Sequence, residues 1–74
     1  MPKLGVFSGK EVCQILAGAG FSHVRTRGSH AVMQGVDSDG ETHTVPIPLH
    51  DEVRKGTLKA IIRQSGLDQA LFMR

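Results

Sequence analysis

The chain has 74 residues, 39% of them hydrophobic, and its nine Lys and Arg against seven Asp and Glu give a formal net charge of +2. This length predicts one domain over residues 1–74, with a core near the lower limit for folding without a disulfide or a metal. The single cysteine, Cys13, excludes an internal disulfide framework, and no apolar run is long enough to span a membrane. We therefore expect a cytoplasmic protein that does not associate with membranes.

The first predicted element is an amphipathic helix from about Ser8 to Ala19. Ser8 and Glu11 have the spacing of a capping box, in which each side chain bonds the backbone of the other residue. Apolar residues from Val12 onward recur at helical spacing and form one stripe. Gly20 supplies the C-terminal stop, since glycine tolerates the left-handed conformation found there.

The middle of the chain is rich in β-branched residues interrupted by turn signals, which predicts strands. Gly28–Ser29 is the expected two-residue turn between the first two strands, and the polar stretch 37–40 is a second turn. A third strand, Glu41–Ile47, should end where Pro46 and Pro48 prevent further central pairing. Consecutive strands with tight connections predict an antiparallel meander.

The last third returns to a helical pattern. Thr57 is the expected N-cap, Gly66 is the expected end, and Phe72 should fold a short tail back onto the core together with Leu67 and Leu71. The expected buried face consists of Leu58, Ile61 and Ile62. The predicted fold class is α+β, with a three-stranded antiparallel sheet and both helices on one of its faces.

Basic residues gather in two places. Lys55, Lys59 and Arg63 are four apart, so they form one stripe of the second helix, which we call the basic ridge. Arg25 and Arg27 alternate along a strand and should project from one sheet face. Such surfaces suit a phosphate backbone, although small helices also carry solvated basic stripes.

Several short motifs occur in a fixed order along the chain. They are Gly28-Ser29-His30, Pro48-Leu49-His50, Lys55-Gly56-Thr57-Leu58 and Ser65-Gly66-Leu67. The ordered set, from about Ser8 to Phe72, resembles the HicA (YcfA-like) family of toxins from toxin–antitoxin pairs. The resemblance implies a fold like a double-stranded-RNA-binding domain, α-β-β-β-α. It also implies cleavage of messenger RNA to block translation, restrained by a HicB-type antitoxin. It assigns catalysis to His30, and His50 matches a second family position without an assigned role.

The chemistry of RNA cleavage fits a histidine at this position. The 2′-hydroxyl of RNA can attack the adjacent phosphate, and the reaction then needs a base, an acid and cations for the developing charge. Histidine can serve as acid or base near neutral pH. His30 shares the parity of Val32, which predicts a place on the helix-covered face, at the rim of the core. Without the resemblance, a structural histidine is the simpler interpretation. The candidate RNA-binding residues are Arg25, Arg27, Ser29, Lys55, Thr57, Lys59 and Arg63.

Three alternatives remain beside the metal-independent ribonuclease. A non-catalytic RNA-binding module of the same fold would need the basic residues but no imidazole, and a DNA-binding domain would not depend on the 2′-hydroxyl. A metal site is disfavoured because no pair of histidines has the short spacing of a helical or finger site. We expect His23 and His43 to be exposed strand residues, Asp37 and Asp39 to form a turn, and no cofactor to be required.

Overall fold

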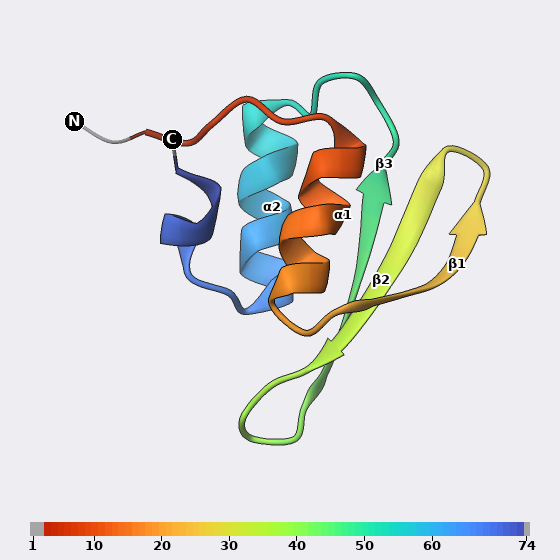
Figure 1. Cartoon of the computed structure of the whole chain (residues 1–74), viewed down its shortest axis with the longest axis vertical. Helices are drawn as coiled ribbons and strands as arrows, with labels where there is room; N and C mark the ends of the chain where they lie inside the picture. The colour runs from red at the N-terminus through yellow and green to blue at the C-terminus, as the bar shows by residue number, and fades with distance from the viewer. Residues whose placement is uncertain (1–2, 74) are drawn as a thin grey trace.

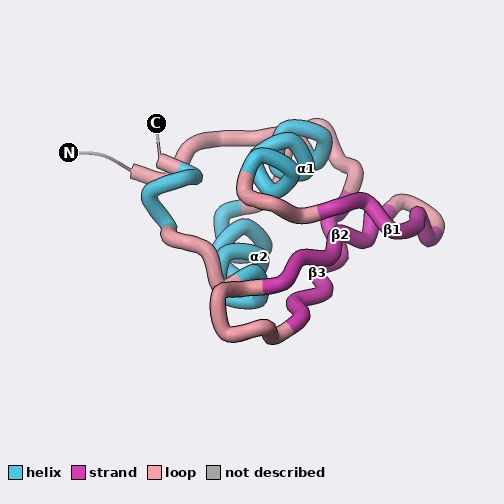
Figure 2. The backbone as a smooth tube through the Cα atoms, turned by 60° about the horizontal axis from the view of Figure 1, so that its bottom comes forward, coloured by secondary structure: helices cyan, strands magenta, loops and turns pink. Residues whose placement is uncertain are grey.

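The computed structural model describes residues 3–73 and has the predicted order of helix, three strands and helix (Figure 1). The elements are α1 (Gly9–Gly18), β1 (Ser22–Arg27), β2 (His30–Val36), β3 (Thr42–Pro48), α2 (Lys55–Ser65) and the short 3-10 helix η1 (Gln69–Phe72). The strands form one antiparallel sheet in the order β1-β2-β3. Both helices lie on the same side of this sheet (Figure 2), which confirms the two-layer α+β fold of the double-stranded-RNA-binding-domain type.

The start of α1 has the predicted capping box. The Ser8 hydroxyl accepts from the Glu11 N–H at 3.1 Å, and the Glu11 carboxylate accepts from the Ser8 N–H at 2.9 Å. The buried side of this helix carries Val12 and Leu16. The chain then leaves the helix through Gly20, whose φ of 98° is the positive value expected for a glycine stop.

The third strand contains Pro46, as predicted, and ends at Pro48, one residue beyond the predicted end at Ile47. Pro46 pairs with Val32 and Pro48 pairs with His30. The prolines are tolerated because β3 is an edge strand. The Leu49 N–H points toward β2, where it bonds the carbonyl of Ser29, so by alternation both proline nitrogens point away from the sheet.

The second helix begins earlier than predicted. Its N-cap is Arg54, which makes no side-chain capping bond, and Thr57 lies inside the first turn. Thr57 is therefore not the cap that its residue type suggested. The predicted end is confirmed, because Gly66 closes the helix in the left-handed conformation with a φ of 71°.

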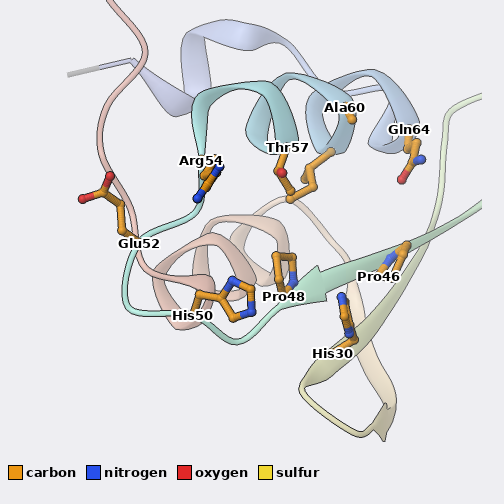
Figure 3. A pocket seen from close by; sticks show the side chains of 10 residues that line it. His30, Pro46, Pro48, His50, Glu52, Arg54, Thr57, Ala60 and Gln64 are labelled. Atoms are coloured by element: carbon orange, nitrogen blue, oxygen red, sulfur yellow. The ribbon is translucent and has the colours of Figure 1, made fainter.

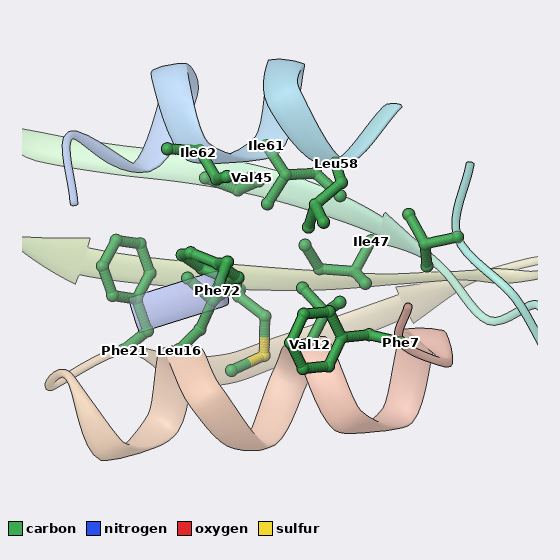
Figure 4. Close-up of a cluster of buried hydrophobic side chains, with 12 residues drawn as sticks. Phe7, Val12, Leu16, Phe21, Val45, Ile47, Leu58, Ile61, Ile62 and Phe72 are labelled. Atoms are coloured by element: carbon green, nitrogen blue, oxygen red, sulfur yellow. The ribbon is translucent and has the colours of Figure 1, made fainter. Parts of the chain in front are cut away.

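The core lies between the two helices and the inner face of the sheet (Figure 4). Phe72 folds back into it with no exposed surface and meets the ring of Phe7 edge-on, with 6.4 Å between centroids. Leu71, predicted to join this tail contact, is instead 50% exposed. Cys13 packs against the core, where burial raises the pKa of its thiol above the ordinary value.

Candidate functional site

His30 lies on the sheet face opposite the helices, which corrects the prediction drawn from Val32. Met33 of β2 and Val45 of β3 are cross-strand partners, and both belong to the core. The odd-numbered residues of these two strands therefore face the helices. His30 and Val32 are even-numbered residues of β2, so their side chains project from the opposite face of the sheet. Val32 is buried outside the core cluster, in a hollow on the open face of the sheet. The apolar type of Val32 was therefore a poor guide to which face of the sheet it occupies.

A groove of about 400 Å³ runs between β3 and α2, along the β3 edge of the sheet, and His30 reaches it from the open face (Figure 3). Its polar lining residues are His30, His50, Glu52, Arg54, Thr57 and Gln64. His30 enters from the first residue of β2, and His50 enters two residues beyond the end of β3. The groove therefore holds two imidazoles and a guanidinium: His30 comes from the start of β2, and His50 and Arg54 come from the connection between β3 and α2.

The backbone fixes the positions of both histidines. The Leu49 N–H donates to the Ser29 carbonyl at 2.7 Å, so the residues immediately preceding the two histidines are hydrogen-bonded to each other. The carbonyl of His50 accepts from the N–H of Gly9 at 2.9 Å, which ties this segment to the first residue of α1. Gly9 is required there, because a Cβ at this position would lie 2.0 Å from the carbonyl oxygen of Pro48.

The first turn of α2 gives the groove a second positive feature. Arg54 precedes the helix without capping it, and the first turn contains no acidic residue to offset the helix dipole. The free N–H groups at such a helix end and the positive end of its dipole both favour an anion. Thr57 brings a hydroxyl from this turn into the groove. This end of the groove can therefore hold a phosphate.

A neighbouring hollow of about 440 Å³ lies on the open face of the sheet and contains Arg25 and Arg27. The two arginines share this face, as their alternation predicts. His30 lines this hollow and the groove alike, with Pro46 beside it. His30 thus stands where a surface bearing two guanidinium groups meets the groove.

The structure separates the basic ridge from the groove. At about 100° per residue, the stripe of Lys55, Lys59 and Arg63 lies roughly 140° around the helix axis from the stripe that faces the groove. The ridge residues do not line the groove in the described chain, residues 3–73. Ser29 lies in the exposed turn before His30, where its carbonyl accepts from Leu49.

The remaining two histidines lie elsewhere. His23 is exposed, as predicted, and its Nε2 lies 2.8 Å from the Thr26 hydroxyl. His43 is not an exposed strand residue, because its side chain is only 22% exposed and bridges two segments. Its Nε2 lies 2.8 Å from a carboxylate oxygen of Asp37, and its Nδ1 lies 2.9 Å from the carbonyl of Gln64.

The hydrogen bond between His43 and Asp37 shifts the pKa values of both side chains. The hydrogen bond to Asp37 is the main cause of the raised pKa of His43, and the same bond lowers the pKa of Asp37. Asp37 also shapes the predicted turn by accepting from the N–H groups of Asp39 and Glu41. Among residues 3–73, no group of three or more His, Cys, Asp or Glu side chains could hold a metal ion.

Comparison with known protein families shows to which family this chain belongs. The family model described as the HicA toxin of bacterial toxin–antitoxin matches residues 9–67. The chain belongs to the HicA toxin family. It is thereby placed on the toxin side of a bacterial toxin–antitoxin pair, and the matched range of this HicA-family chain includes all the groove residues named above. No curated protein matches the chain. Within residues 3–73, the HicA-family chain has no helix that is both long and apolar enough to cross a membrane.

Proposed function

We propose that this chain is a metal-independent endoribonuclease that cleaves messenger RNA and so blocks translation, with His30 as a general acid or base. The observation that carries the proposal is the position of His30 between the hollow of Arg25 and Arg27 and the groove at the start of α2. A strand held by cations on both sides would present one of its phosphates to the imidazole.

The reaction would use the nucleophile that RNA itself carries. The 2′-hydroxyl attacks the adjacent phosphorus, and the bond from phosphorus to the 5′-oxygen breaks, leaving a 2′,3′-cyclic phosphate and a 5′-hydroxyl. A positioned imidazole that takes up or delivers one of the protons contributes about 10²–10⁴-fold to the rate. The guanidinium of Arg54 and the N-terminal end of α2 stabilise the negative charge on the phosphate oxygens.

The RNA-binding residues fall into two groups in this proposal. Arg25, Arg27 and Ser29 lie before His30, and Thr57 lines the groove from the first turn of α2, so these residues can hold phosphates beside the reacting one. Lys55, Lys59 and Arg63, which form the basic ridge on the other flank of α2, act at longer range by drawing RNA to the surface.

The antitoxin would be a HicB-type protein that blocks this site. An acidic surface covering the groove at His30, or the basic ridge on the other flank of α2, would match the charge of the toxin and exclude RNA. Competition between the antitoxin and a labelled RNA for the purified toxin measures this directly.

The test of the ribonuclease is cleavage of a labelled single-stranded RNA in EDTA by the parent and by His30→Ala. His23→Ala is the matched control, because His23 is an exposed histidine of the same sheet that lies outside the groove. We expect the parent and the control to cleave, and His30→Ala to bind RNA but cleave it about 10²–10⁴-fold more slowly.

Three results would contradict the proposal. Binding without cleavage by the parent would identify a non-catalytic RNA-binding module. Equal cleavage by the parent and His30→Ala would remove His30 from the chemistry. A substrate with a 2′-deoxy residue at the cleavage site should bind and resist cleavage, and its cleavage would exclude the 2′-hydroxyl as nucleophile.

A further inference from the structure

The cleavage reaction requires two proton transfers, and a single imidazole accounts for only one of them. In-line displacement puts the attacking 2′-oxygen and the leaving 5′-oxygen on opposite sides of phosphorus. One proton must leave the first oxygen and another must reach the second. A histidine fixed on one side of the phosphate reaches only one of these oxygens, so the groove needs a proton-transfer group on the other side.

We propose that His50 is this second group, so that His30 and His50 form an acid–base pair on either side of the scissile phosphate. The inference rests on the proposed ribonuclease activity and adds a catalytic residue to it. One imidazole takes the proton of the 2′-hydroxyl as that oxygen bonds to phosphorus. The other, protonated, gives its proton to the 5′-oxygen as the bond to phosphorus breaks. The pair ends the step with its protons exchanged, and proton transfer through water restores it.

The strand geometry spaces the two residues for this task. His30 pairs with Pro48, and His50 is two residues further along the same chain. About 5 Å between paired strands and about 3.3 Å per residue along them put the two Cα atoms roughly 8 Å apart. The imidazoles both face the groove (Figure 3), and this spacing leaves room for one phosphate with a hydrogen bond of about 2.8 Å on each side.

The backbone holds this spacing constant. The bond from Leu49 to Ser29 joins the two segments directly before the histidines, and the bond from Gly9 to the His50 carbonyl anchors the second segment to α1. Neither anchor uses an imidazole nitrogen, so the backbone bonds leave both rings available to the substrate. A fixed distance between the two imidazoles favours proton transfer between each ring and its substrate oxygen.

The other charged residues near His50 are poorly suited to the role. Arg54 stays protonated and cannot exchange a proton, so its part is to stabilise charge. Glu52 lines the groove, but its carboxylate points away from both imidazoles (Figure 3). Lys10 and Asp51 line a separate hollow that His50 also borders, and neither lines the groove. His50 is therefore the residue that can complete the pair with His30.

The experiment is single-turnover cleavage by the parent, His30→Ala, His50→Ala and His50→Gln, with His23→Ala as the control. Each protein is used above the Kd for the RNA, so that the rate reports chemistry, and thermal unfolding confirms that each is folded. We expect each variant of His30 and His50 to be slowed about 10²–10⁴-fold with RNA affinity nearly unchanged. Gln keeps a hydrogen-bonding side chain, so the loss in His50→Gln reports proton transfer.

A second substrate identifies the acid. In an RNA with sulfur in place of the bridging 5′-oxygen, the leaving thiol has a pKa of about 8.5 and departs without a proton. The variant that lacks the acid should recover on this substrate, and the variant that lacks the base should remain slow. Recovery of one variant and not the other is the expected result.

Three outcomes would overturn the pair. His50 variants that cleave as fast as the parent would exclude His50 while leaving His30 as the catalytic residue. Recovery of both alanine variants, or of neither, on the sulfur substrate would contradict the division into acid and base. A parent that cleaves no RNA would refute the proposed function itself, and the pair with it.

Discussion

Replacing Gly9 with alanine should destabilise the protein, although alanine is the better helix former. A Cβ at Gly9 would lie 2.0 Å from the Pro48 carbonyl oxygen and 2.9 Å from the Cα of Leu49. Both are backbone atoms, so no change of rotamer relieves the overlap, and α1 must move away from the end of β3. Overpacking of this kind costs about 1–3 kcal/mol.

The helix propensity of alanine offsets part of this cost. Because a Cβ only 2.0 Å from a backbone oxygen is a severe overlap, its cost lies in the upper part of this range, about 2–3 kcal/mol. Alanine is favoured over glycine by about 1 kcal/mol within a helix, so the net loss is about 1–2 kcal/mol. For a domain of this size each kcal/mol shifts Tm by about 4–8 °C, which predicts a decrease of roughly 4–16 °C for Gly9→Ala. Thermal unfolding followed by circular dichroism measures this change.

Gly18→Ala is the matched control, because Gly18 belongs to the same helix and a Cβ there would meet nothing within 4 Å. It should raise stability by about 0.5–1 kcal/mol through helix propensity and a less flexible unfolded chain. A Tm for Gly9→Ala at or above that of the parent would refute the reasoning. Because the Gly9 N–H also bonds the His50 carbonyl, Gly9→Ala should further slow RNA cleavage while folded, whereas Gly18→Ala should not.

Three other perturbations have defined outcomes. The bridge between His43 and Asp37 should stabilise the fold fully between about pH 3.9 and pH 6.5, the ordinary pKa values of the two groups. Because the folded-state pKa is raised for His43 and lowered for Asp37, this contribution is lost as pH rises through the former or falls through the latter, so His43→Gln should show a flatter dependence of Tm on pH. Phe72→Ala removes a fully buried ring and should cost about 3–5 kcal/mol in urea unfolding, and a loss below 1 kcal/mol would contradict its place in the core. Replacing Arg25 or Arg27 by Gln should weaken RNA binding and reduce the slope of log K against log salt by about 0.7 for each phosphate that the arginine neutralises, and an unchanged slope would exclude that arginine from the RNA surface.

Local rules predicted the elements whose determinants lie close together in sequence. The capping box at Ser8, the turn at Gly28–Ser29 and the stop at Gly66 each depend on a few neighbouring residues, and each is confirmed. The end of β3 was predicted one residue too early because the tolerance of Pro48 in a strand depends on which strand lies at the edge of the sheet. That is a property of the whole topology.

The groove required information that no local pattern contains. The face occupied by His30 follows from the pairing of β2 with β3, whereas the burial of Val32 arises from the open face of the sheet. Sequence motifs predicted His30 as the catalytic candidate and included His50 without a role. They did not indicate that Arg54 lines the same groove. The spacing of four that defined the basic ridge is a property of one helix, and it says nothing about what that face of the helix meets.

The two ends of the described chain meet at one point on the surface. Leu4 and Met73 form an antiparallel bridge, and the Gly5 N–H donates to the Phe72 carbonyl at 2.8 Å. The described groove lining comes from neither terminal segment. A short linker could therefore join the ends in a circularly permuted chain opened at the turn at 37–40, leaving the segments that carry His30 and His50 intact. Such a permutant would bring the second helix close to the first in sequence and would show whether the order of the elements matters for reaching this fold.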